Sequence, residues 1–125
     1  MDSLTARNEL FTSRFISKAS YLIDARMGGN VISLYNVNPS NMEDITKYAE
    51  SLQVNPHKTS CAAQAISYTI LLTAGLVCSS VRNVLVGNPN PFNMALDAQN
   101  FMLQADTIRT HESHQPGRER TAARV

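Results

Sequence analysis

The sequence predicts an all-α protein in which about four helices form a bundle. One observation is that the stretch from Thr59 to Val81, between Lys58 and Arg82, contains no charged residue. A second is that apolar residues in the flanking segments recur every three or four positions, the period of an amphipathic helix. A third is that four of the five prolines follow asparagine, and Asn-Pro dipeptides are typical of helix starts. We therefore expect a single helical domain over residues 1–110.

The first helix is predicted over residues 3–27. Its charged residues sit largely off one apolar face, as an amphipathic helix requires. The run Gly28-Gly29-Asn30 is expected to end this helix, since Gly and Asn accept the left-handed conformation of a C-terminal cap. The apolar face is formed by Leu4, Phe11, Phe15 and Leu22, widened by Ile16, Ala19 and Ile23.

Residues 31–37, with the sequence VISLYNV, leave two interpretations open. Their β-branched and aromatic composition favours a short extended segment. The more ordinary interpretation is an apolar connection over the core or the continuation of a helix. A single strand cannot satisfy its own hydrogen bonds, so an extended segment here would have to pair with a second copy or a partner.

The second helix is predicted from about Met42 to Gln53. Ser40 and Glu43 have the spacing of a capping box, in which the hydroxyl and the carboxylate each accept a backbone N–H. Asp44 follows directly, and acidic residues stabilise the first turn of a helix through its dipole. We therefore interpret this acidic pair as structural and not as a general acid and base.

The third helix is predicted to begin at Thr59 or Ser60 and to end near Val86, and it is about 30 Å long over its charge-free part. Hydroxyl and amide groups dilute its apolar residues, so we expect burial on nearly all sides in a bundle or assembly, with a membrane span over residues 59–81 or a strand-containing core as alternatives. The pairs Ala74/Cys78 and Gly75/Ser79 place small residues one turn apart, which lets another backbone approach closely.

The two cysteines, Cys61 and Cys78, would lie about 25 Å apart on that helix. A disulfide between them is then geometrically impossible. Buried, inert thiols in a reducing compartment are the expectation, and the N-terminal residues do not have the pattern of a cleavable signal peptide. The cellular location is otherwise left open.

The fourth helix is predicted from Asn90-Pro91 to about Thr110. Its apolar residues follow alternating steps of four and three, which is the spacing of a coiled-coil seam. Apolar residues on two faces need two neighbours, so we expect self-association or a stable helical partner. The predicted association seam comprises Met94, Ala98, Phe101, Ala105 and Ile108, with Leu96 and Leu103 on the opposite side.

Residues 111–125 are expected to form a flexible polar and basic tail. Arg118, Arg120 and Arg124 are the candidate nucleic-acid contacts, although Glu112 and Glu119 offset much of their charge. A formal net charge of +1 and the absence of tryptophan argue against a strong electrostatic field and against base-stacking platforms.

No motif of a known catalytic centre, cofactor site or metal site is apparent in the sequence. The prediction is a non-enzymatic helical protein without a cofactor or metal, acting through protein–protein contacts as a self-associating structural or assembly subunit. One alternative is a small coat or nucleoprotein-type subunit with weak nucleic-acid contact through the tail. The other is a small single-pass membrane protein with its span at residues 59–81.

Overall fold

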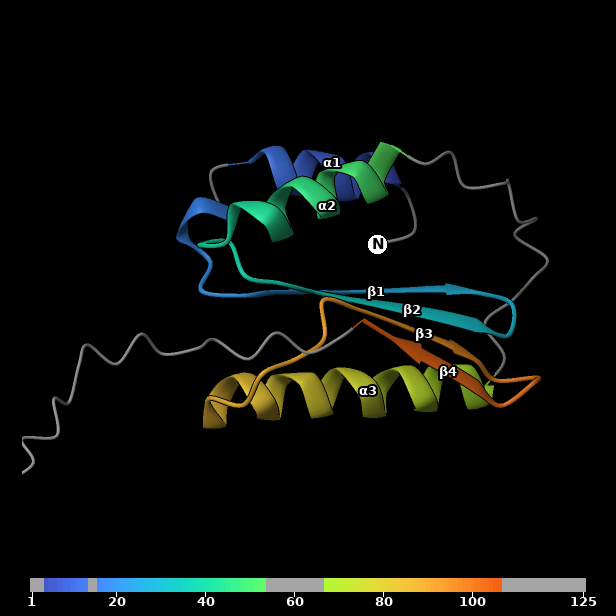
Figure 1. Cartoon of the computed structure of the whole chain (residues 1–125). Coiled ribbons are helices and arrows are strands. Elements are labelled where there is room, and N and C mark those ends of the chain that lie inside the picture. Colours follow the sequence, from blue (N-terminus) through green and yellow to red (C-terminus); the bar gives the residue numbers. More distant parts are fainter. Residues whose placement is uncertain (1–3, 14–15, 54–66, 107–125) are drawn as a thin grey trace, which may run out of the picture.

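The computed structural model describes residues 4–13, 16–53 and 67–106, and it shows an α+β fold in three layers. A four-stranded antiparallel sheet lies in the middle, α1 and α2 cover one of its faces, and α3 lies on the other (Figure 1). The prediction of an all-α bundle is therefore wrong. The expected start of the third helix and the tail at residues 111–125 lie outside the described residues.

Two hairpins, β1–β2 and β3–β4, make up the sheet. The sheet order is β1-β2-β3-β4, so each strand pairs with its neighbour in sequence. The elements are α1 (Leu4–Thr12), a 3-10 turn (Ile16–Lys18), β1 (Leu22–Gly28), β2 (Val31–Val37), α2 (Met42–Gln53), α3 (Ser67–Val86), β3 (Asn93–Asp97) and β4 (Met102–Ala105).

The helix predicted over residues 3–27 is correct only as far as Thr12. Beyond it, β1 pairs with β2 from Leu22↔Val37 to Gly28↔Val31. The turn between them is Gly29-Asn30, with Gly29 at φ +61°, so the glycine that was expected to cap a helix instead closes a two-residue hairpin. Along β1, apolar and polar residues alternate with the period of two that a strand requires. Pairing with β2 selects this strand period over the helical one.

Of the two interpretations left open for residues 31–37, the extended one is correct, with β2 spanning Val31–Val37. The expectation that such a strand would need a second copy is wrong, because β1 and β3 flank it within one chain. Ile32 and Leu34 are fully buried on one face of the strand, and Val37 is fully buried on the other. Burial on both faces explains the nearly continuous apolar run of this strand, since a strand covered on two sides has no polar face.

The predicted bounds of α2, Met42 to Gln53, are confirmed, but its cap is one residue later than predicted. The Asn41 side-chain oxygen accepts the Glu43 backbone N–H at 3.0 Å, and the Asn41 carbonyl accepts the Ile45 N–H at 3.1 Å. Asn41 is therefore the N-cap in place of Ser40. An asparagine caps a helix by the same geometry as a serine. The predicted type of cap is therefore correct, and only the capping residue differs.

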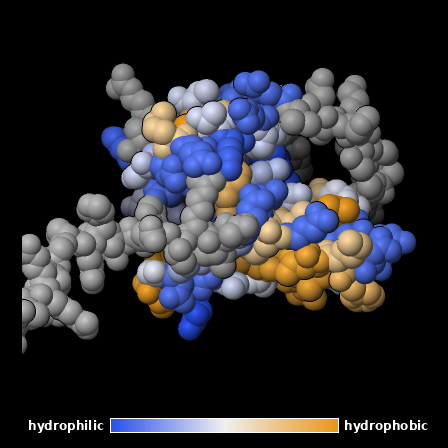
Figure 2. Space-filling model, viewed as in Figure 1, coloured by the Kyte–Doolittle hydropathy of each residue, from blue (hydrophilic) through white to orange (hydrophobic). Residues whose placement is uncertain are grey.

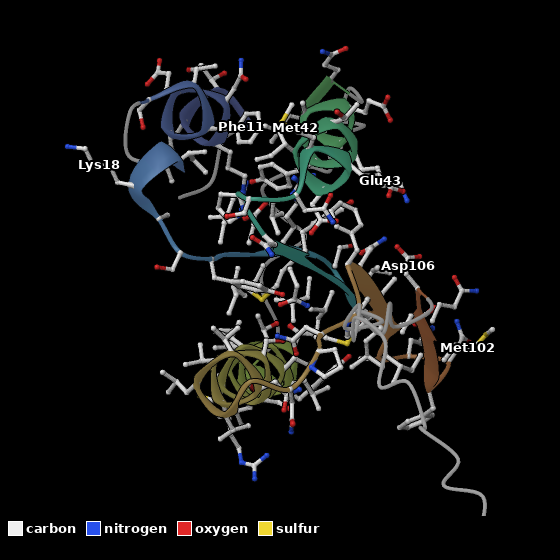
Figure 3. All side chains as sticks on the ribbon, turned by 60° about the vertical axis from the view of Figure 1, so that its left-hand side comes forward. Phe11, Lys18, Met42, Glu43, Met102 and Asp106 are labelled. Atoms are coloured by element: carbon white, nitrogen blue, oxygen red, sulfur yellow. The ribbon has the colours of Figure 1, made fainter. Side chains whose placement is uncertain are left out.

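The core between the sheet and the two N-terminal helices centres on Val37, Tyr48 and Leu52. Phe11 projects from α1 toward α2 (Figure 3), and its ring meets that of Tyr48 edge-to-face at 5.1 Å between centroids. Tyr35 packs against Tyr48 in the same way at 6.0 Å. Edge-to-face pairs of this kind add to the stabilisation from burial.

The helix predicted over residues 90–110 is wrong, because residues 93–105 form the β3–β4 hairpin. Asp97 closes the loop by accepting the backbone N–H of Gln99 at 2.9 Å and of Asn100 at 3.1 Å. Phe101 completes it at φ 53°. Short apolar runs fit either a helix or a strand. Here the hydrogen bonds between the Asp97 side chain and the following backbone stabilise a turn, and a turn at this position is compatible with a hairpin and not with a helix.

Val37→Ala should lower the free energy of unfolding by about 2 kcal/mol, because Val37 is fully buried in the α1/α2 core. Val31→Ala provides the matched control at the other end of the same strand, where the side chain is 44% exposed. Its expected cost is below about 0.5 kcal/mol. Urea unfolding followed by circular dichroism measures both, and equal losses would contradict the assigned core.

Candidate functional site

The helix α3 lies on the sheet with its polar side inward. Thr69, Thr73 and Ser80 are its buried residues, and they face β1 and β2, the strands that α3 contacts most. The Thr73 hydroxyl donates to the Thr69 carbonyl at 2.7 Å, so its polarity is satisfied within the helix. Small side chains at one to two turns' spacing let the helix approach the sheet closely.

Polar side chains hold α3 at both of its ends. At its start, the Tyr68 hydroxyl donates to the side-chain oxygen of Asn30 in the β1–β2 turn. At its end, the Asn83 amide donates to Asn90 at 2.9 Å, and the Asn90 amide donates to the Ser80 carbonyl at 3.0 Å. These bonds fix which side of α3 faces the sheet. The remaining side chains around the helix face away from the sheet.

The outward face of α3 is apolar and exposed (Figure 2). Leu71 is 74% and Leu85 is 80% exposed, and Arg82 is the one charged residue in the helix. Within one chain the expectation of a helix buried on nearly all sides is therefore wrong. The large exposed apolar residues of α3 are Tyr68, Ile70, Leu71, Leu72, Val81, Leu85 and Val86.

Along the centre of this outward face, two leucines flank the small residues Gly75 and Cys78 and the charged residue Arg82. Leu71, Gly75, Cys78, Arg82 and Leu85 follow steps of four, three, four and three, which is the spacing of a seam on one side of a helix. Leu71 lies seven residues before Cys78 and Leu85 lies seven residues after it. The two leucines are therefore placed symmetrically about Cys78, whereas Gly75 and Arg82, three residues before it and four after it, are not. The expectation of a buried thiol is wrong for Cys78, which is free and exposed; Cys61 lies outside the described residues.

By length and composition, α3 is long and apolar enough to cross a membrane; it is the one such helix in the part of the chain that the structure describes. Its other side, however, is packed on an open-edged antiparallel sheet. Open sheet edges do not occur in the hydrocarbon region of a bilayer. A membrane span would therefore require α3 to leave the sheet and expose the buried Thr69 and Ser80.

The predicted association seam is divided by the hairpin. Met94 pairs with Ala105 and Leu96 with Leu103, and these four residues lie on the α3 side of the sheet. Ala98 and Phe101 are instead in the connecting loop, and Phe101 is 91% exposed. Ile108 and the three arginines at positions 118, 120 and 124 lie outside the described residues.

Two exposed features on or near these elements were not singled out from the sequence. Met102 of β4 is 56% exposed and points away from the body of the molecule (Figure 3). The outward line of α3 was noted only as a pair of small-residue spacings. Its heptad steps were visible in the sequence, but which side of the helix faces the sheet was not.

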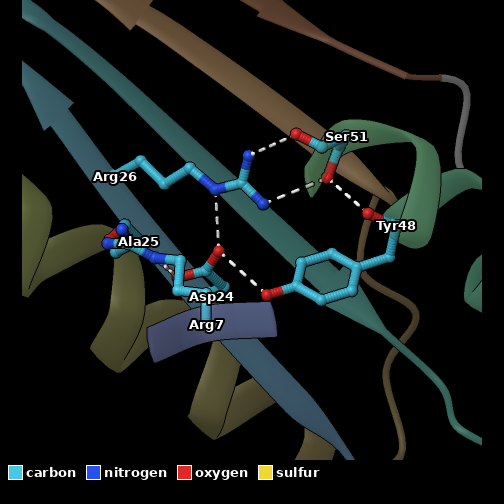
Figure 4. Close-up of polar contacts among 6 residues, drawn as sticks. All are labelled: Arg7, Asp24, Ala25, Arg26, Tyr48 and Ser51. Carbon is cyan, nitrogen blue, oxygen red and sulfur yellow. Dashed lines mark hydrogen bonds and ion pairs between the residues drawn. The ribbon is translucent and has the colours of Figure 1, made fainter. Parts of the chain in front are cut away.

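The densest charged cluster surrounds Asp24 on the other face of the sheet (Figure 4). Its carboxylate accepts from Arg7 at 3.0 Å, from Arg26 at 2.8 Å and from the Tyr48 hydroxyl at 3.1 Å. Arg26 also donates to the Ser51 carbonyl at 3.1 Å and to the Ser51 hydroxyl at 3.0 Å. The cluster ties α1, β1 and α2 together.

The protonation states in this cluster suit a structural role. Burial acts to raise the pKa of Asp24, but the hydrogen bonds and charges of Arg26 and Arg7 outweigh it and hold that pKa below its ordinary value. Burial, together with the charge of Asp24 and the hydrogen bond to it, raises the pKa of Tyr48 to about 12. A carboxylate held by three donors is a poor general base, because proton uptake would break those bonds.

Among residues 4–13, 16–53 and 67–106, no three His, Cys, Asp or Glu side chains gather closely enough to hold a metal ion. No protein-family model, no curated protein and no solved structure matches this chain. The candidate site rests on the exposed apolar residues of the outward face of α3.

Asp24→Asn should lower the free energy of unfolding at pH 7 by about 2 kcal/mol, because two arginines lose a partly buried charged partner. The pKa of Asp24 is lowered in the folded state, so its contribution is fully present above the ordinary carboxyl value near 4 and is lost as the pH falls below it. The difference between wild type and variant should shrink over that acidic range. Urea unfolding at stepped pH measures it.

Glu50→Gln is the control for this prediction, since Glu50 is exposed on α2. The substitution changes the net charge by the same amount as Asp24→Asn does. A constant difference between wild type and Asp24→Asn from pH 7 to pH 2 would contradict the ionised cluster.

Proposed function

We propose that this protein is a self-associating subunit whose copies pair through the outward face of α3. The supporting observation is that the most apolar helix of the chain turns its hydroxyl side to the sheet and its apolar side outward. Contiguous exposed apolar surface on a soluble protein marks an interaction site. The function is thus a structural or assembly role carried by protein contacts.

The occupant of this face is a second copy of the chain. In an antiparallel pair related by a twofold axis at Cys78, Leu71 of each copy meets Leu85 of the other, because both lie seven residues from the axis. Such a self-complementary pattern is what a twofold interface needs. Gly75, beside which an added Cβ would meet open space, lets the two backbones come close near the centre.

Protein fits this surface better than lipid for two reasons. The sheet packed behind α3 has open edges, which a bilayer core does not tolerate. Arg82 also lies on the outward side, and an arginine within a span is costly. At a helix pair, the long stem of Arg82 covers apolar surface of the seam while its guanidinium extends out of the seam to water.

Leu71→Glu should convert the associated protein to monomer, because an unpaired carboxylate in a desolvated seam costs about 3 kcal/mol or more, which is over a hundredfold in the dissociation constant. Met42→Glu is the matched control. Met42 is 73% exposed, nearly the same as Leu71 at 74%, but lies on α2 on the opposite layer. Light scattering coupled to gel filtration gives the mass of each variant.

A wild-type protein that is monomeric at millimolar concentration would contradict this proposal. So would equal masses for the Leu71→Glu and Met42→Glu variants across a dilution series.

Mild oxidation should join two copies through Cys78, since a twofold axis at this residue brings the two thiols together. A disulfide needs Cα atoms within about 7 Å. The experiment uses Cys61→Ser, so that Cys78 is the remaining thiol, and Cys61→Ser with Leu71→Glu as the control. Non-reducing electrophoresis should show a rapid dimer band only for the first protein. Equal crosslinking in both would mean random collision and not a seam.

A further inference from the structure

A cavity of about 780 Å³ opens at one end of the sheet, away from the centre of the outward face of α3. It is bordered by Tyr21 before β1, by the β2–α2 connection, by the α3–β3 connection and by Asp106 after β4. Because the sheet is antiparallel, the starts of β1 and β3 and the ends of β2 and β4 all meet at this edge. Cavities of this size hold small organic ligands.

A buried, unsatisfied acceptor lines this cavity. Asn36 is 1% exposed, and its side-chain oxygen has no hydrogen-bond partner among the described residues. Its orientation is fixed, since the amide nitrogen donates to the Pro91 carbonyl at 3.0 Å and a carbonyl cannot donate in return. A buried acceptor left without a donor is costly, so this oxygen favours a ligand that brings an N–H group.

The charged residues of the cavity favour a cation. Asp44 and Asp106 contribute two carboxylates. Lys47 is the basic residue of the lining, and its ammonium already pairs with Glu43 at 3.1 Å. The cavity therefore combines negative charge with a free acceptor.

The remaining lining suits the uncharged part of such a ligand. Five of the thirteen lining residues are asparagines. The oxygens of Asn38 and Asn41 accept backbone N–H groups at 2.9 Å and 3.0 Å, so their amide NH₂ groups are the atoms best placed to donate to a ligand carbonyl or hydroxyl. Phe92 and Val84 supply apolar surface. A bare metal ion would use little of this volume.

We propose that this cavity binds a small organic cation, a molecule with a guanidinium or ammonium group and an uncharged polar body. The cationic N–H groups donate to the carboxylates of Asp44 and Asp106 and, once the groups that cover it move aside, to the buried oxygen of Asn36. The polar body lies against the asparagine amides. Arginine-type guanidinium groups fit well because their planar donors reach several oxygens at once.

The test titrates the full-length ¹⁵N-labelled chain with N-acetyl-argininamide, which carries one guanidinium and no other charge. Its matched control is N-acetyl-citrullinamide, a neutral molecule of nearly the same shape. The expected result is a saturable shift of the Asn36 side-chain amide and of the Gly87 and Asn88 backbone amides, with at least about tenfold weaker binding of the control. Gly28 and Gly29, at the other end of the sheet, should not shift.

Asp44→Asn should weaken binding of the charged probe by about tenfold, because it removes the carboxylate yet keeps an oxygen for the Asn38 N–H at 3.1 Å. Glu50→Gln, which lies outside the cavity on α2, should bind as the wild type does. If Asp44→Asn does not fold, Asp106→Asn is the second variant.

Three outcomes would overturn the proposal. The charged probe produces no saturable shift, or the neutral probe binds equally well, or the shifted amides lie on the outward face of α3. Because the Leu71→Glu variant leaves every lining residue intact, repeating the titration with it separates this proposal from that of self-association.

Discussion

The structure depends on the contact between the hydroxyl side of α3 and the sheet. Thr69, Thr73 and Ser80 are buried there, and they place the helix close to the fully buried Ile32 and Leu34. Because three small polar residues occupy the inner side, most of the large apolar side chains of the helix are exposed. The most apolar segment of the chain thus becomes its surface, while the α1/α2 core forms around residues from less apolar segments. Association is the usual way to remove such a surface from water.

Sequence signals within a single segment were enough to predict an element only where several of them agree. The bounds of α2 were predictable because a capping residue, an acidic first turn and a helical apolar period agree over residues 42–53. The β-branched composition of residues 31–37 only left an extended segment open beside a connection or a helix, and the structure selects the strand. The other strands were not predictable in this way. Leu22 and Leu96 satisfy helical as well as strand spacing over short runs, and only pairing with β2, which joins residues more than fifty positions apart at Ile32↔Leu96, selects the strand.

The candidate site was visible in the sequence as a pattern but not as a surface. The hydroxyl groups of the charge-free helix look like a dilution of its hydrophobicity, whereas in the fold they mark the side that packs on the sheet. Without the sheet, the direction of Leu71 and Cys78 is undefined, and attention falls on the apolar residues after Asn90 instead. The unsatisfied oxygen of Asn36 was likewise beyond sequence reasoning, because an asparagine in a strand becomes informative only when its neighbours are known.

The two proposed sites share the last turns of α3, and this has a physical consequence. Leu85 lies on the outward face, whereas the adjacent Val84 lines the cavity, and the bonds from Asn83 to Asn90 and from Asn90 to Ser80 join the end of α3 to the connection that borders it. Pairing of two copies near Leu85 would restrain these turns, and a ligand in the cavity would restrain the same segment from the other side. Each event then reduces the ordering cost of the other, so binding and association are expected to be positively coupled.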